Sequence, residues 1–462
     1  MDFAAVNRII KAYDIRGLVD EELTPDFTFA LGVAFARFLE GQREPATVVI
    51  GEDMRPSSPE LAGAFSDGVT SQSFDVIRIG LASTDQLYFA SGELGLPGAM
   101  FTASHNPAQY NGIKLCLSGA RPIGQESGLG WIKNEILNGA PLGLRQLGVE
   151  RSAEMLEPYV DFLYSLFSDG AFTRDFQGRK LRIAIDAGNG MGGHTAPAVM
   201  SRINSDIFSL YFELDGTFPN HEANPIDPKN LVDLQKLVTE NKADIGLAFD
   251  GDADRCFLVD ETGAAISPSA LTALIAQREL RANPGAKIIH NLICSKSVAE
   301  VITESGGIPI RSRVGHSFIK KLMAESGAIF GGEHSGHFYF RDFWFADSGM
   351  LAALHAIDAL LDEGRPLSEV IRPFDRYAMS GELNTSVSNQ QGAIAAVRSE
   401  FESLPNPPRF DELDGLTVSG EDWWFNLRPS NTEPLLRLNV EAQTQRAMIE
   451  LRDRVLASIK SQ

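Results

Sequence analysis

The sequence predicts an α/β protein with three α/β units and a smaller C-terminal α+β unit. An apolar, strand-like run followed by a turn and the start of a helix recurs three times, at residues 48–51, 182–186 and 287–290. Strands that alternate with helices in this way are typical of α/β folds. The chain has 462 residues, of which 44% are hydrophobic and 22% charged, enough for about three or four domains with substantial cores.

Helical periodicity is clear in residues 27–39, 231–240 and 350–361, and helices there would cover the sheet faces. Arg372-Pro373 interrupts the last of these patterns. We expect the domains to span residues 1–150, 151–257, 258–371 and 372–462. In the last domain, alternating stretches at 416–427 and 435–441 precede a helical tail at 445–459, which predicts an α+β fold.

Composition and charge exclude several classes of protein. The formal net charge of -20 repels nucleic acid and anionic membranes, so we expect neither as a partner. We find no run of about 18 apolar residues and no secretory signal at residues 1–19. Cys116, Cys256 and Cys294 are odd in number and far apart, which indicates reduced thiols. These observations predict a cytoplasmic enzyme.

Asp250, Asp252 and Asp254 form the most informative cluster of charges in the chain. Three neighbouring carboxylates raise one another's pKa values unless a cation neutralises them, so we expect a metal site. Small Gly251 and Ala253 would let the loop curl until the carboxylate oxygens converge. Such oxygens favour Mg²⁺ or Ca²⁺ over zinc.

Two alternatives remain for this acidic cluster. An EF-hand calcium loop also has carboxylates at alternate positions, and Glu261 falls where that loop has its bidentate glutamate. Against it, Arg255 stands where the loop needs glycine, and the flanking runs 245–249 and 256–259 read as strands rather than helices. The second alternative is a solvated turn, since aspartates are common in turns.

Ser104 lies between two strand-like runs, residues 98–101 and 112–117, with turn signals between them. A hairpin here would bring Lys114 near Ser104, where a lysine can hold a phosphate and aid proton transfer. Together with the aspartates, the serine suggests a covalent phosphoenzyme held against a divalent cation. The alternatives are a serine that only forms a turn and a lysine on an exposed strand face.

A further polar loop, residues 332–337, lies between the strand-like runs 328–330 and 338–340, and we expect it to be exposed. Carboxylate and hydroxyl groups form directional hydrogen bonds to vicinal hydroxyls, so Glu333 and Ser335 make this loop a candidate sugar-binding site. The alternative is a capped turn that contains a glutamate by chance.

Residues 188–193 match the dinucleotide fingerprint GxGxxG and follow an apolar strand, with Glu213 and Asp215 about where a ribose-binding acid belongs. An NAD(P)-dependent sugar dehydrogenase is therefore a competing class of enzyme. Asp186-Ala187 separates the strand from the first glycine, however, and this hypothesis leaves the serine and aspartate loops unexplained. A third class, a catalytically silent binding or scaffold protein, would keep the fold but retain no phosphate on Ser104.

Several longer motifs occur in a fixed order along the chain. They are YDIRG (13–17), TASHNP (102–107), YNGIK (110–114), DGDADR (250–255), GGEHSGH (331–337) and RPSNTEP (428–434). In these motifs the chain resembles the α-D-phosphohexomutase family, and within it the bacterial phosphomannomutase/phosphoglucomutase members. The resemblance covers nearly the whole chain. It implies a heart-shaped molecule of three related mixed-sheet α/β domains and a smaller α+β domain around a central cleft.

The resemblance also implies roles for single residues. Ser104 would carry the phosphoryl group and, with Asp250, Asp252 and Asp254, would hold Mg²⁺. The other catalytic residues would be Arg16, His105, Lys114 and Arg255. Glu333 and Ser335 would contact O3 and O4 of the sugar, which permits both mannose and glucose. The remaining substrate-binding residues would be Lys296, His316, His337, Arg428, Ser430, Asn431 and Thr432, the last four at the distal phosphate. The alternatives are a surface lysine at a helix start for Lys296, histidines without substrate contact for His316, which would only precede the N-cap Ser317, and His337, and an arginine at a hairpin end for Arg428.

Two positions depart from the family pattern. His334 replaces the methionine common in the mannose/glucose enzymes and the glutamine of phosphoglucosamine mutases, so phosphoglucosamine mutase is the alternative within the family. Ile293 stands where a relative often has lysine, and Lys296 is the candidate substitute.

The implied reaction interconverts hexose 6-phosphate and hexose 1-phosphate through a phosphoserine enzyme. Hexose 1,6-bisphosphate would be both intermediate and activator, and Mg²⁺ the cofactor. We expect small hexose phosphates as the partners and a monomer or small homo-oligomer. Because the net charge of -20 also repels sugar phosphates, the site must build a local positive cleft. Its candidate members are Arg16, Lys114, Arg255, Lys296, His316, His337 and Arg428.

Overall fold

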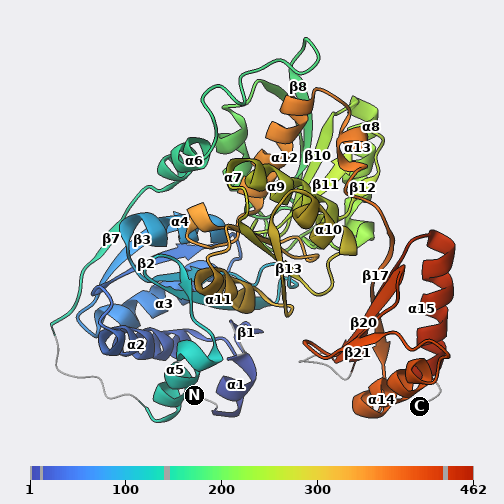
Figure 1. The fold of residues 1–462 in the computed structure, drawn as a ribbon. Coiled ribbons are helices and arrows are strands. Elements are labelled where there is room, and N and C mark those ends of the chain that lie inside the picture. Colours follow the sequence, from blue (N-terminus) through green and yellow to red (C-terminus); the bar gives the residue numbers. More distant parts are fainter. Residues whose placement is uncertain (1–2, 11–13, 140–145, 430–434, 461–462) are drawn as a thin grey trace.

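The computed structural model describes residues 3–10, 14–139, 146–429 and 435–460, which form four domains (Figure 1). The first three contain mixed β-sheets with packed helices, and the fourth contains an antiparallel sheet with two helices. The predicted fold class is therefore confirmed. In Figure 1 the fourth domain, in red, lies to one side of the other three.

The first domain has a seven-stranded sheet in the order β1-β5-β4-β2-β3-β7, with β6 paired to β5. Its strands are β1 (Ile15–Leu18), β2 (Thr47–Glu52), β3 (Asp75–Leu81), β4 (Gly98–Phe101), β5 (Tyr110–Leu117), β6 (Arg121–Pro122) and β7 (Glu150–Ser152). Its helices are α1 (Phe3–Ile9), α2 (Pro25–Gln42), α3 (Ser58–Thr70), α4 (Thr84–Leu94), the π-helix η1 (Gln125–Leu129) and α5 (Gly130–Leu137).

The second domain has a five-stranded sheet in the order β12-β11-β10-β8-β9. Its strands are β8 (Leu181–Asp186), β9 (Ser205–Leu210), β10 (Ile245–Phe249), β11 (Cys256–Asp260) and β12 (Ala265–Ile266). Its helices are α6 (Leu156–Ser165), α7 (Gly192–Met200), the 3₁₀-helix η2 (Pro228–Leu231) and α8 (Val232–Asn241). The boundary expected at residue 257 falls inside β11, which pairs with β10 along its whole length, so the second sheet continues to β12.

The third domain has a four-stranded sheet in the order β14-β13-β15-β16. Its strands are β13 (Lys287–Asn291), β14 (Ile308–Ser312), β15 (Phe330–Gly332) and β16 (Phe338–Phe340). Its helices are α9 (Pro268–Ala282), α10 (Lys296–Glu304), α11 (His316–Ser326), the 3₁₀-helix η3 (Arg341–Phe343), α12 (Gly349–Glu363) and α13 (Leu367–Ile371).

The fourth domain has a five-stranded antiparallel sheet in the order β17-β21-β20-β19-β18. Its strands are β17 (Ala378–Ser386), β18 (Arg409–Asp411), β19 (Leu416–Ser419), β20 (Trp423–Pro429) and β21 (Leu435–Ala442). Its helices are α14 (Gln390–Glu402) and α15 (Gln445–Lys460).

The first three sheets share one topology. In each, a parallel strand turns back into an antiparallel partner, and the pairs are β4 with β5, β10 with β11 and β15 with β16. The connecting loops, residues 102–109, 250–255 and 333–337, contain the serine, aspartate and sugar-loop motifs, respectively. We call them the serine loop, the acidic loop and the sugar loop. The repeated topology thus places three functional motifs at equivalent positions.

Local sequence explains where the expected helices begin. Thr24 caps α2 by accepting a hydrogen bond from the amide of Phe27, and Pro25 occupies the first turn, where it displaces no intrahelical bond. Ser348 caps α12 in the same way through the amide of Leu351. Both helices bury one apolar face against a sheet or a neighbouring helix.

The domains differ in how they share their cores. One continuous apolar cluster contains buried residues of all of the first three domains, whereas the fourth domain has a cluster of its own. At the junction of the first three domains, Tyr159 and Ser348 both donate to Oδ2 of Asp85 at 2.7 Å. Burial raises the pKa of Asp85 to about 6. This junction fixes α4, and hence Thr84 at its N-terminus, next to the acidic loop.

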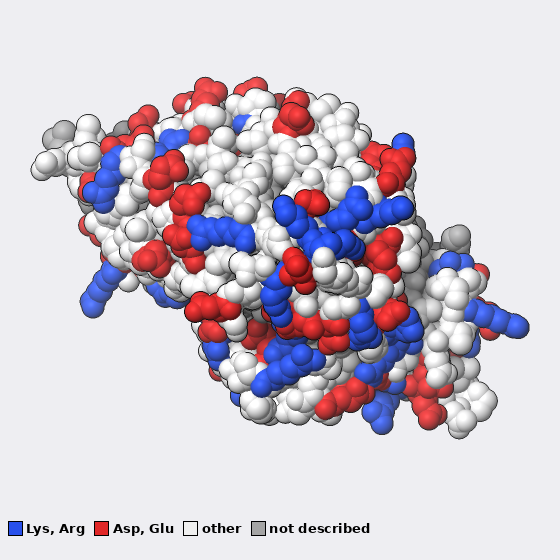
Figure 2. All heavy atoms as spheres, turned by 90° about the horizontal axis from the view of Figure 1, so that it is seen from above, with Lys and Arg blue, Asp and Glu red and all other residues white. Residues whose placement is uncertain are grey.

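Acidic and basic side chains are mixed on the molecular surface that Figure 2 shows. Figure 2 shows acidic and basic side chains interspersed over one face, with a group of Lys and Arg side chains near its middle. Among the described residues, no helix combines the length and apolar character that crossing a membrane requires.

Candidate active site

The serine loop holds Ser104 in an unusual conformation. Ser104 has a φ of 53°, in the left-handed region that L-residues seldom occupy, and its amide donates to Oγ1 of Thr102 at 2.9 Å. The residue is almost fully buried, with 5% of its surface exposed. The turn thus points the hydroxyl out of the first domain toward the second.

The acidic loop meets the serine loop through a glycine. A Cβ atom added to Gly251 would lie 2.3 Å from the carbonyl oxygen of Ser104, closer than any side chain permits. Two residues later, Ala253 has a φ of 59°, which turns the chain back into β11. The loop therefore curls as expected, and its close approach to Ser104 requires glycine.

Four side chains converge at the contact of these two loops. The hydroxyl of Ser104 lies 2.9 Å from Oδ2 of Asp250 and 3.1 Å from Nδ1 of His105. Arg255 donates to Oγ of Ser104 at 3.2 Å and through Nε to Oδ2 of Asp250 at 2.8 Å, and it also contacts His105. The predicted grouping of Ser104, His105, Asp250 and Arg255 is thus observed in the geometry.

Electrostatics distinguishes Asp250 from Asp252. Burial raises the pKa of Asp250 well above its usual range, although Arg255 opposes this. Burial acts on Asp252 too, but the ammonium of Lys114 and the hydroxyl of Thr84, each 2.6 Å from its Oδ2, hold its pKa below the usual range. Burial also lowers the pKa of His105 well below its ordinary value, with Arg255 acting in the same direction. The imidazole is therefore neutral.

Lys114 reaches the acidic loop rather than the serine. Its Nζ lies 2.6 Å from Oδ2 of Asp252 and 2.6 Å from Oδ2 of Asp254, and 3.5 Å from the hydroxyl of Thr84. Although burial opposes it, the two carboxylates raise the pKa of Lys114 well above its usual range. The hairpin was expected to bring Lys114 to Ser104. Instead, the lysine joins the serine-bearing domain to the metal-binding candidates.

The acidic loop fits a hard divalent cation. Asp250, Asp252 and Asp254 each offer an oxygen, and these oxygens lie within 4.8 Å of one another. Oδ1 of Asp252 and Oδ1 of Asp254 are buried without a hydrogen-bond partner among the described residues. Buried carboxylate oxygens left without donors are costly, and a cation would satisfy them.

The sugar loop is more buried than expected. Glu333 is 2% exposed, and its carboxylate accepts hydrogen bonds from Asn291 at 3.2 Å, the amide of Gly315 at 3.1 Å and the hydroxyl of Tyr339 at 2.8 Å. The expectation of an exposed loop is therefore wrong for Glu333. Because both carboxylate oxygens have donors, the side chain has a fixed orientation.

His337 connects the sugar loop to the acidic loop. Its Nε2 lies 3.6 Å from Oδ1 of Asp254, and its Nδ1 lies 3.0 Å from the hydroxyl of Ser335. The backbones of Arg255 and His337 form an antiparallel bridge. In the same loop, burial lowers the pKa of His334 to about 4, so its ring is neutral. The three loops thus form one contiguous surface from three domains.

Two predicted cationic residues lie at the edges of this surface. Arg16 donates to Asn106 of the serine loop at 2.5 Å and to Asp14 at 2.7 Å. Arg428 is 6% exposed, donates to Asn439 at 3.1 Å and pairs with Glu382. Ser430, Asn431, Thr432 and the side chain of His316 lie outside the described residues.

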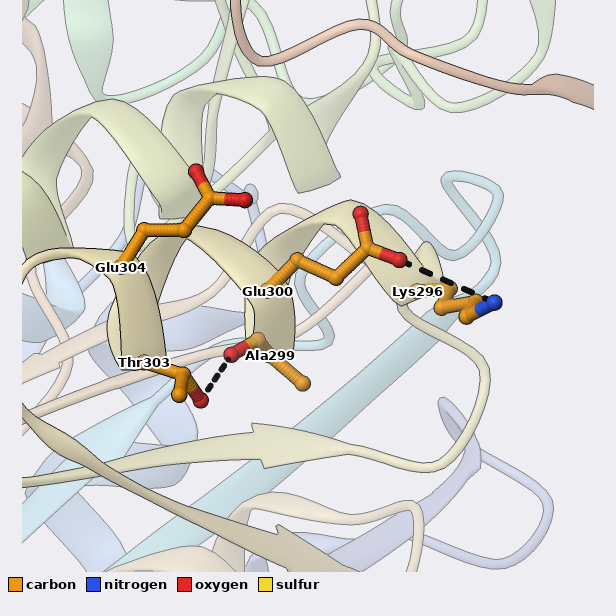
Figure 3. A pocket seen from close by; sticks show the side chains of 5 residues that line it. All are labelled: Lys296, Ala299, Glu300, Thr303 and Glu304. Carbon is orange, nitrogen blue, oxygen red and sulfur yellow. Dashed lines mark hydrogen bonds and ion pairs between the residues drawn. The ribbon is translucent and has the colours of Figure 1, made fainter.

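Lys296 does not join the site. Figure 3 shows it on α10, in a shallow surface pocket of about 390 Å³ lined by Ala299, Glu300, Thr303 and Glu304. Its ammonium lies 3.0 Å from the carbonyl of Glu421 and 3.7 Å from Glu300, and it contacts no other predicted site residue among those described. The structure does not support Lys296 as a substitute for the lysine that relatives often have at the position of Ile293. Lys296 is the first residue of α10, and its ammonium points to Glu421 of the fourth domain.

Sequence reasoning missed residues that support the loops. Arg55 donates to the carbonyl of Ser104 at 2.9 Å, and Asp53 pairs with Arg55. Asn291 and Tyr339 orient Glu333, and Thr84 binds Asp252. One signal could have identified Asp53 and Arg55, since both directly follow the apolar strand 48–51, and the carboxyl ends of parallel strands are where binding sites form.

The glycine-rich turn at residues 188–193 supports the acidic loop. A Cβ atom added to Gly190 would lie 2.7 Å from the carbonyl oxygen of Gly251, and the amide of Met191 donates to that oxygen at 2.9 Å. The glycines are thus accounted for by close backbone packing, without a dinucleotide.

Comparisons with known proteins identify the family to which the chain belongs. Models of the phosphoglucomutase/phosphomannomutase family match the chain as α/β/α domain I at residues 7–140, domain II at 157–263, domain III at 267–377 and the C-terminal domain at 382–458.

A phosphomannomutase of Salmonella typhimurium is 39% identical over 98% of both chains. A protein of Xanthomonas campestris named among the phosphohexose mutases is 37% identical over 97% of this chain and 98% of its own. A crystal structure of a phosphoglucomutase/phosphomannomutase family protein from Burkholderia thailandensis superposes with a TM-score of 0.87 at 31% identity, covering 98% of each chain. With matches over nearly its whole length, the chain belongs to the phosphoglucomutase/phosphomannomutase family of phosphohexomutase enzymes.

Proposed function

We propose that the protein interconverts hexose 6-phosphate and hexose 1-phosphate through a phosphoserine at position 104. The observation that supports this most strongly is the contact of Ser104 with Asp250 and Arg255, at 2.9 and 3.2 Å. A serine hydroxyl from one domain meets a carboxylate cluster and a guanidinium from another. This arrangement suits a phosphoryl group that needs both a cation and hydrogen-bond donors.

The reaction has two phosphoryl transfers. In the first, the free hydroxyl of the hexose phosphate attacks the phosphorus of phosphoserine 104, an O–P bond forms, and the Oγ–P bond breaks. The hydroxyl loses a proton and Oγ of Ser104 regains one, so the charge balances. His105, with Nδ1 3.1 Å from Oγ, is placed to exchange that proton, and Arg255 is placed to stabilise the charge that develops on the phosphoryl oxygens.

The product of this first step is hexose 1,6-bisphosphate. It turns around in the site, and its other phosphoryl group returns to Ser104, which regenerates the phosphoenzyme. Added bisphosphate would therefore activate dephosphorylated enzyme. We assign the distal phosphate to Arg428. By family resemblance we place Arg16 near the reacting hydroxyl, and we propose that Lys114 aids proton transfer.

Mg²⁺ is the cofactor that we propose, held by Asp250, Asp252, Asp254 and the phosphoserine. When bound, it would neutralise negative charge on the transferring phosphoryl group. Two of the carboxylate oxygens are buried without donors among the described residues, and this supports the proposed cation.

We propose mannose phosphates, and glucose phosphates as well, as the substrates. The support is the set of relatives named phosphomannomutase and the fixed carboxylate of Glu333, which we assign with Ser335 to O3 and O4 of the sugar. A residue that reads O3 and O4 does not distinguish the two sugars at C2. We also propose a cytoplasmic enzyme, as a monomer or small homo-oligomer.

The test is a side-by-side assay of mannose, glucose and glucosamine phosphates with Mg²⁺ and a trace of hexose 1,6-bisphosphate. We expect turnover of mannose and glucose phosphates, and a phosphorylated tryptic peptide containing Ser104. Turnover of glucosamine phosphate alone would replace the substrate assignment. Absence of phosphate from Ser104 in an active enzyme would overturn the mechanism.

A further inference from the structure

Arg55 makes more contacts with the serine loop than any predicted catalytic residue does. It follows β2 and its side chain is 0% exposed. Its Nη1 donates to the carbonyls of Pro107 at 3.0 Å and Tyr110 at 2.8 Å. Its Nη2 donates to the carbonyls of Ser104 at 2.9 Å and Asn106 at 2.7 Å. One guanidinium therefore binds four backbone oxygens in and just after the serine loop.

These contacts use the whole donor capacity of the side chain. A guanidinium has five N–H groups in a rigid fork, and Nε of Arg55 donates to Oδ2 of Asp53 at 3.2 Å. Asp53 is itself fixed, since its Oδ1 accepts from the amide of Arg55 at 3.0 Å and from Ser58 at 2.6 Å. Asp53 therefore fixes the orientation of the guanidinium independently of the serine loop.

The serine loop needs such a partner. Its residues belong to neither β4 nor β5. The carbonyl of Pro107 also accepts from the amide of Tyr110 at 3.0 Å, but those of Ser104 and Asn106 accept from no backbone amide among the described residues, and buried carbonyls require a donor. Ser104 also has the left-handed φ of 53°, which ordinary loop contacts do not favour. Arg55 satisfies the carbonyl of Ser104 itself, and so acts directly on the residue that directs the hydroxyl.

The second domain closes over the same arginine. The ring of Phe218 lies 5.1 Å from Cζ of Arg55, and its edge lies 3.5 Å from the Cβ position of Gly251. A Cβ atom added to Gly216 would lie 2.7 Å from Cα of Arg55. The segment that contains Gly216 and Phe218 thus packs on both Arg55 and the acidic loop, so Arg55 lies between the two halves of the reaction centre.

We propose that Arg55 is a positioning residue for phosphoryl transfer, one that holds the backbone of Ser104 so that Oγ faces Asp250 and Arg255. This inference rests on the proposed function. Arg55 acts through the backbone of the serine loop and has no hydrogen bond to Oγ of Ser104. Its loss should therefore slow the transfer steps and leave the affinity for the sugar phosphate nearly unchanged.

The primary test compares Arg55→Met, Arg55→Lys and the control Arg78→Met. Arg78 lies on β3 of the same sheet, pairs with Glu52, and has no contact with the serine loop among the described residues. We expect kcat to fall about 100-fold in Arg55→Met with KM within about threefold, because small misplacement of a reacting group has effects of this size. Arg55→Lys should recover little, since an ammonium has three donors and no fork.

Phosphorylation of Ser104 provides a second measurement. Dephosphorylated enzyme is mixed with glucose 1,6-bisphosphate, and phosphoryl uptake is followed by intact mass. The rate should fall in parallel with kcat in Arg55→Met and stay unchanged in Arg78→Met. If kcat and the rate of phosphoryl uptake in Arg55→Met match those of Arg78→Met, the inference is wrong and the mutase function stands.

A milder variant covers the case in which Arg55→Met does not fold. Ser58→Ala removes the 2.6 Å bond that orients Asp53 and the 3.0 Å bond from Asn111, which keeps its 2.8 Å bond to Ser57. We expect kcat about three- to tenfold lower with unchanged KM, the size of one lost hydrogen bond. Unchanged kcat in Ser58→Ala, with Arg55→Met unfolded, would make Arg55 a stability residue and overturn the inference.

Hydrogen–deuterium exchange separates this inference from the proposed function. If wild-type enzyme turns over no hexose phosphate, the proposed function fails, and the exchange rate of peptides covering residues 103–111 still tests the positioning. Those amides should exchange faster in Arg55→Met or Ser58→Ala than in Arg78→Met. Equal exchange would count against Arg55 whatever the reaction is.

Discussion

At the scale of single residues, the site depends on backbone conformations that L-residues usually avoid. Ser104 and Ala253 both have left-handed φ values, of 53° and 59°. Each costs on the order of 1 kcal/mol, which neighbouring contacts must offset. For Ser104 the offset comes from Thr102 and Arg55, which bind its amide and its carbonyl. The position of one hydroxyl is thus secured by bonds to its own backbone.

Removal of that hydroxyl gives the first prediction. In Ser104→Ala we expect mutase turnover to fall by at least about 10³-fold and binding of hexose phosphate to remain, because covalent catalysis is lost but the binding groups are not. Calorimetry of substrate binding and a coupled assay measure the two effects. Ser165→Ala, on the exposed end of α6, is the control. Normal turnover in Ser104→Ala would exclude the phosphoserine.

Glu333 gives the second prediction. We expect Glu333→Ala to lower kcat/KM for mannose and glucose phosphates alike, by about 10- to 100-fold, because a group at O3 and O4 does not read C2. Tyr339→Phe removes only the 2.8 Å bond that orients the carboxylate and should cause a smaller, equally shared loss. Loss of one substrate alone in Glu333→Ala would show that the loop does distinguish the sugars at C2.

At the scale of elements, each of the first three sheets has its functional loop at an equivalent hairpin, between a parallel strand and its antiparallel partner. This repetition explains why local motifs were readable from the sequence, because each motif lies between two strands whose apolar runs are continuous. The supporting residues were not readable in the same way. Arg55 binds carbonyls 49 to 55 positions away, and Thr84 binds Asp252 168 positions away, so only the folded sheets bring them together.

The same reasoning explains the misplaced domain boundary. The runs 245–249 and 256–259 were expected to be strands and are β10 and β11. Both strands are buried along their whole length, so the apolar runs predict two strands but do not show which strands are neighbours in a sheet. The expected boundary therefore falls inside β11, which pairs with β10. The predicted helices at 27–39 and 350–361 lie within α2 and α12, because long amphipathic patterns with capping residues are locally determined.

The loop-to-loop contact gives the third prediction. Gly251→Ala would place a methyl group 2.3 Å from the carbonyl of Ser104, so the two loops must separate. We expect kcat to fall about 100-fold, with a loss of about 1–3 kcal/mol in the free energy of unfolding. Gly63→Ala, on α3 where an added Cβ atom meets nothing within 4 Å, should leave both quantities close to wild type. Wild-type activity in Gly251→Ala would mean that the loops need not touch.

The acidic loop gives the fourth prediction. Chelator-treated enzyme should be inactive and be restored by Mg²⁺ better than by Ca²⁺, because phosphoryl transfer needs the smaller ion. Mg²⁺ should also raise the Tm of wild type, by mass action on the folded state, and should do so less in Asp252→Asn. Asp206→Asn, at an exposed pair with Lys180, is the control. Full activity after chelation would make the carboxylates structural.

At the scale of the whole molecule, the fourth domain stands apart in its packing. The first three domains share one apolar cluster, whereas the fourth has its own and meets the third through a small apolar cluster of Leu292, Ile293 and Trp424 and through polar contacts. Arg376 pairs with Glu304 at 2.6 Å, and Glu441 accepts from the amide of Lys296 at 3.0 Å. Polar contacts of this kind are exchanged for water at little cost. The apolar cluster that joins the fourth domain to the third is thus smaller than the one that joins the first three domains.

The arginines of the fourth domain already share a carboxylate. Glu382 pairs with Arg428 and with Arg437, the latter at 3.1 Å. A phosphate that binds Arg428 must therefore compete with Glu382 or share the guanidinium with it. In the proposed mechanism this competition would limit the affinity for the distal phosphate, which would help the bisphosphate to turn around.

The last prediction follows from this competition. Arg428→Ala should raise the Kd for hexose 1- and 6-phosphates roughly 10- to 100-fold, equivalent to about 1.5–3 kcal/mol of charge-assisted hydrogen bonding. Phosphorylation of Ser104 should survive, because the serine loop belongs to another domain. The variant should also release more hexose 1,6-bisphosphate into solution, since the turning intermediate loses one of its two anchors.

Arg437→Ala is the matched control, because it frees the same carboxylate while removing a more exposed guanidinium, 35% accessible against 7% for Arg428. We expect at most a threefold change in Kd for Arg437→Ala. If the two variants weaken substrate binding equally, the effect comes from the liberated charge of Glu382 rather than from a phosphate clamp. If neither changes KM or bisphosphate release, the distal phosphate binds elsewhere, and the polar interface of the fourth domain then serves only to hold that domain in place.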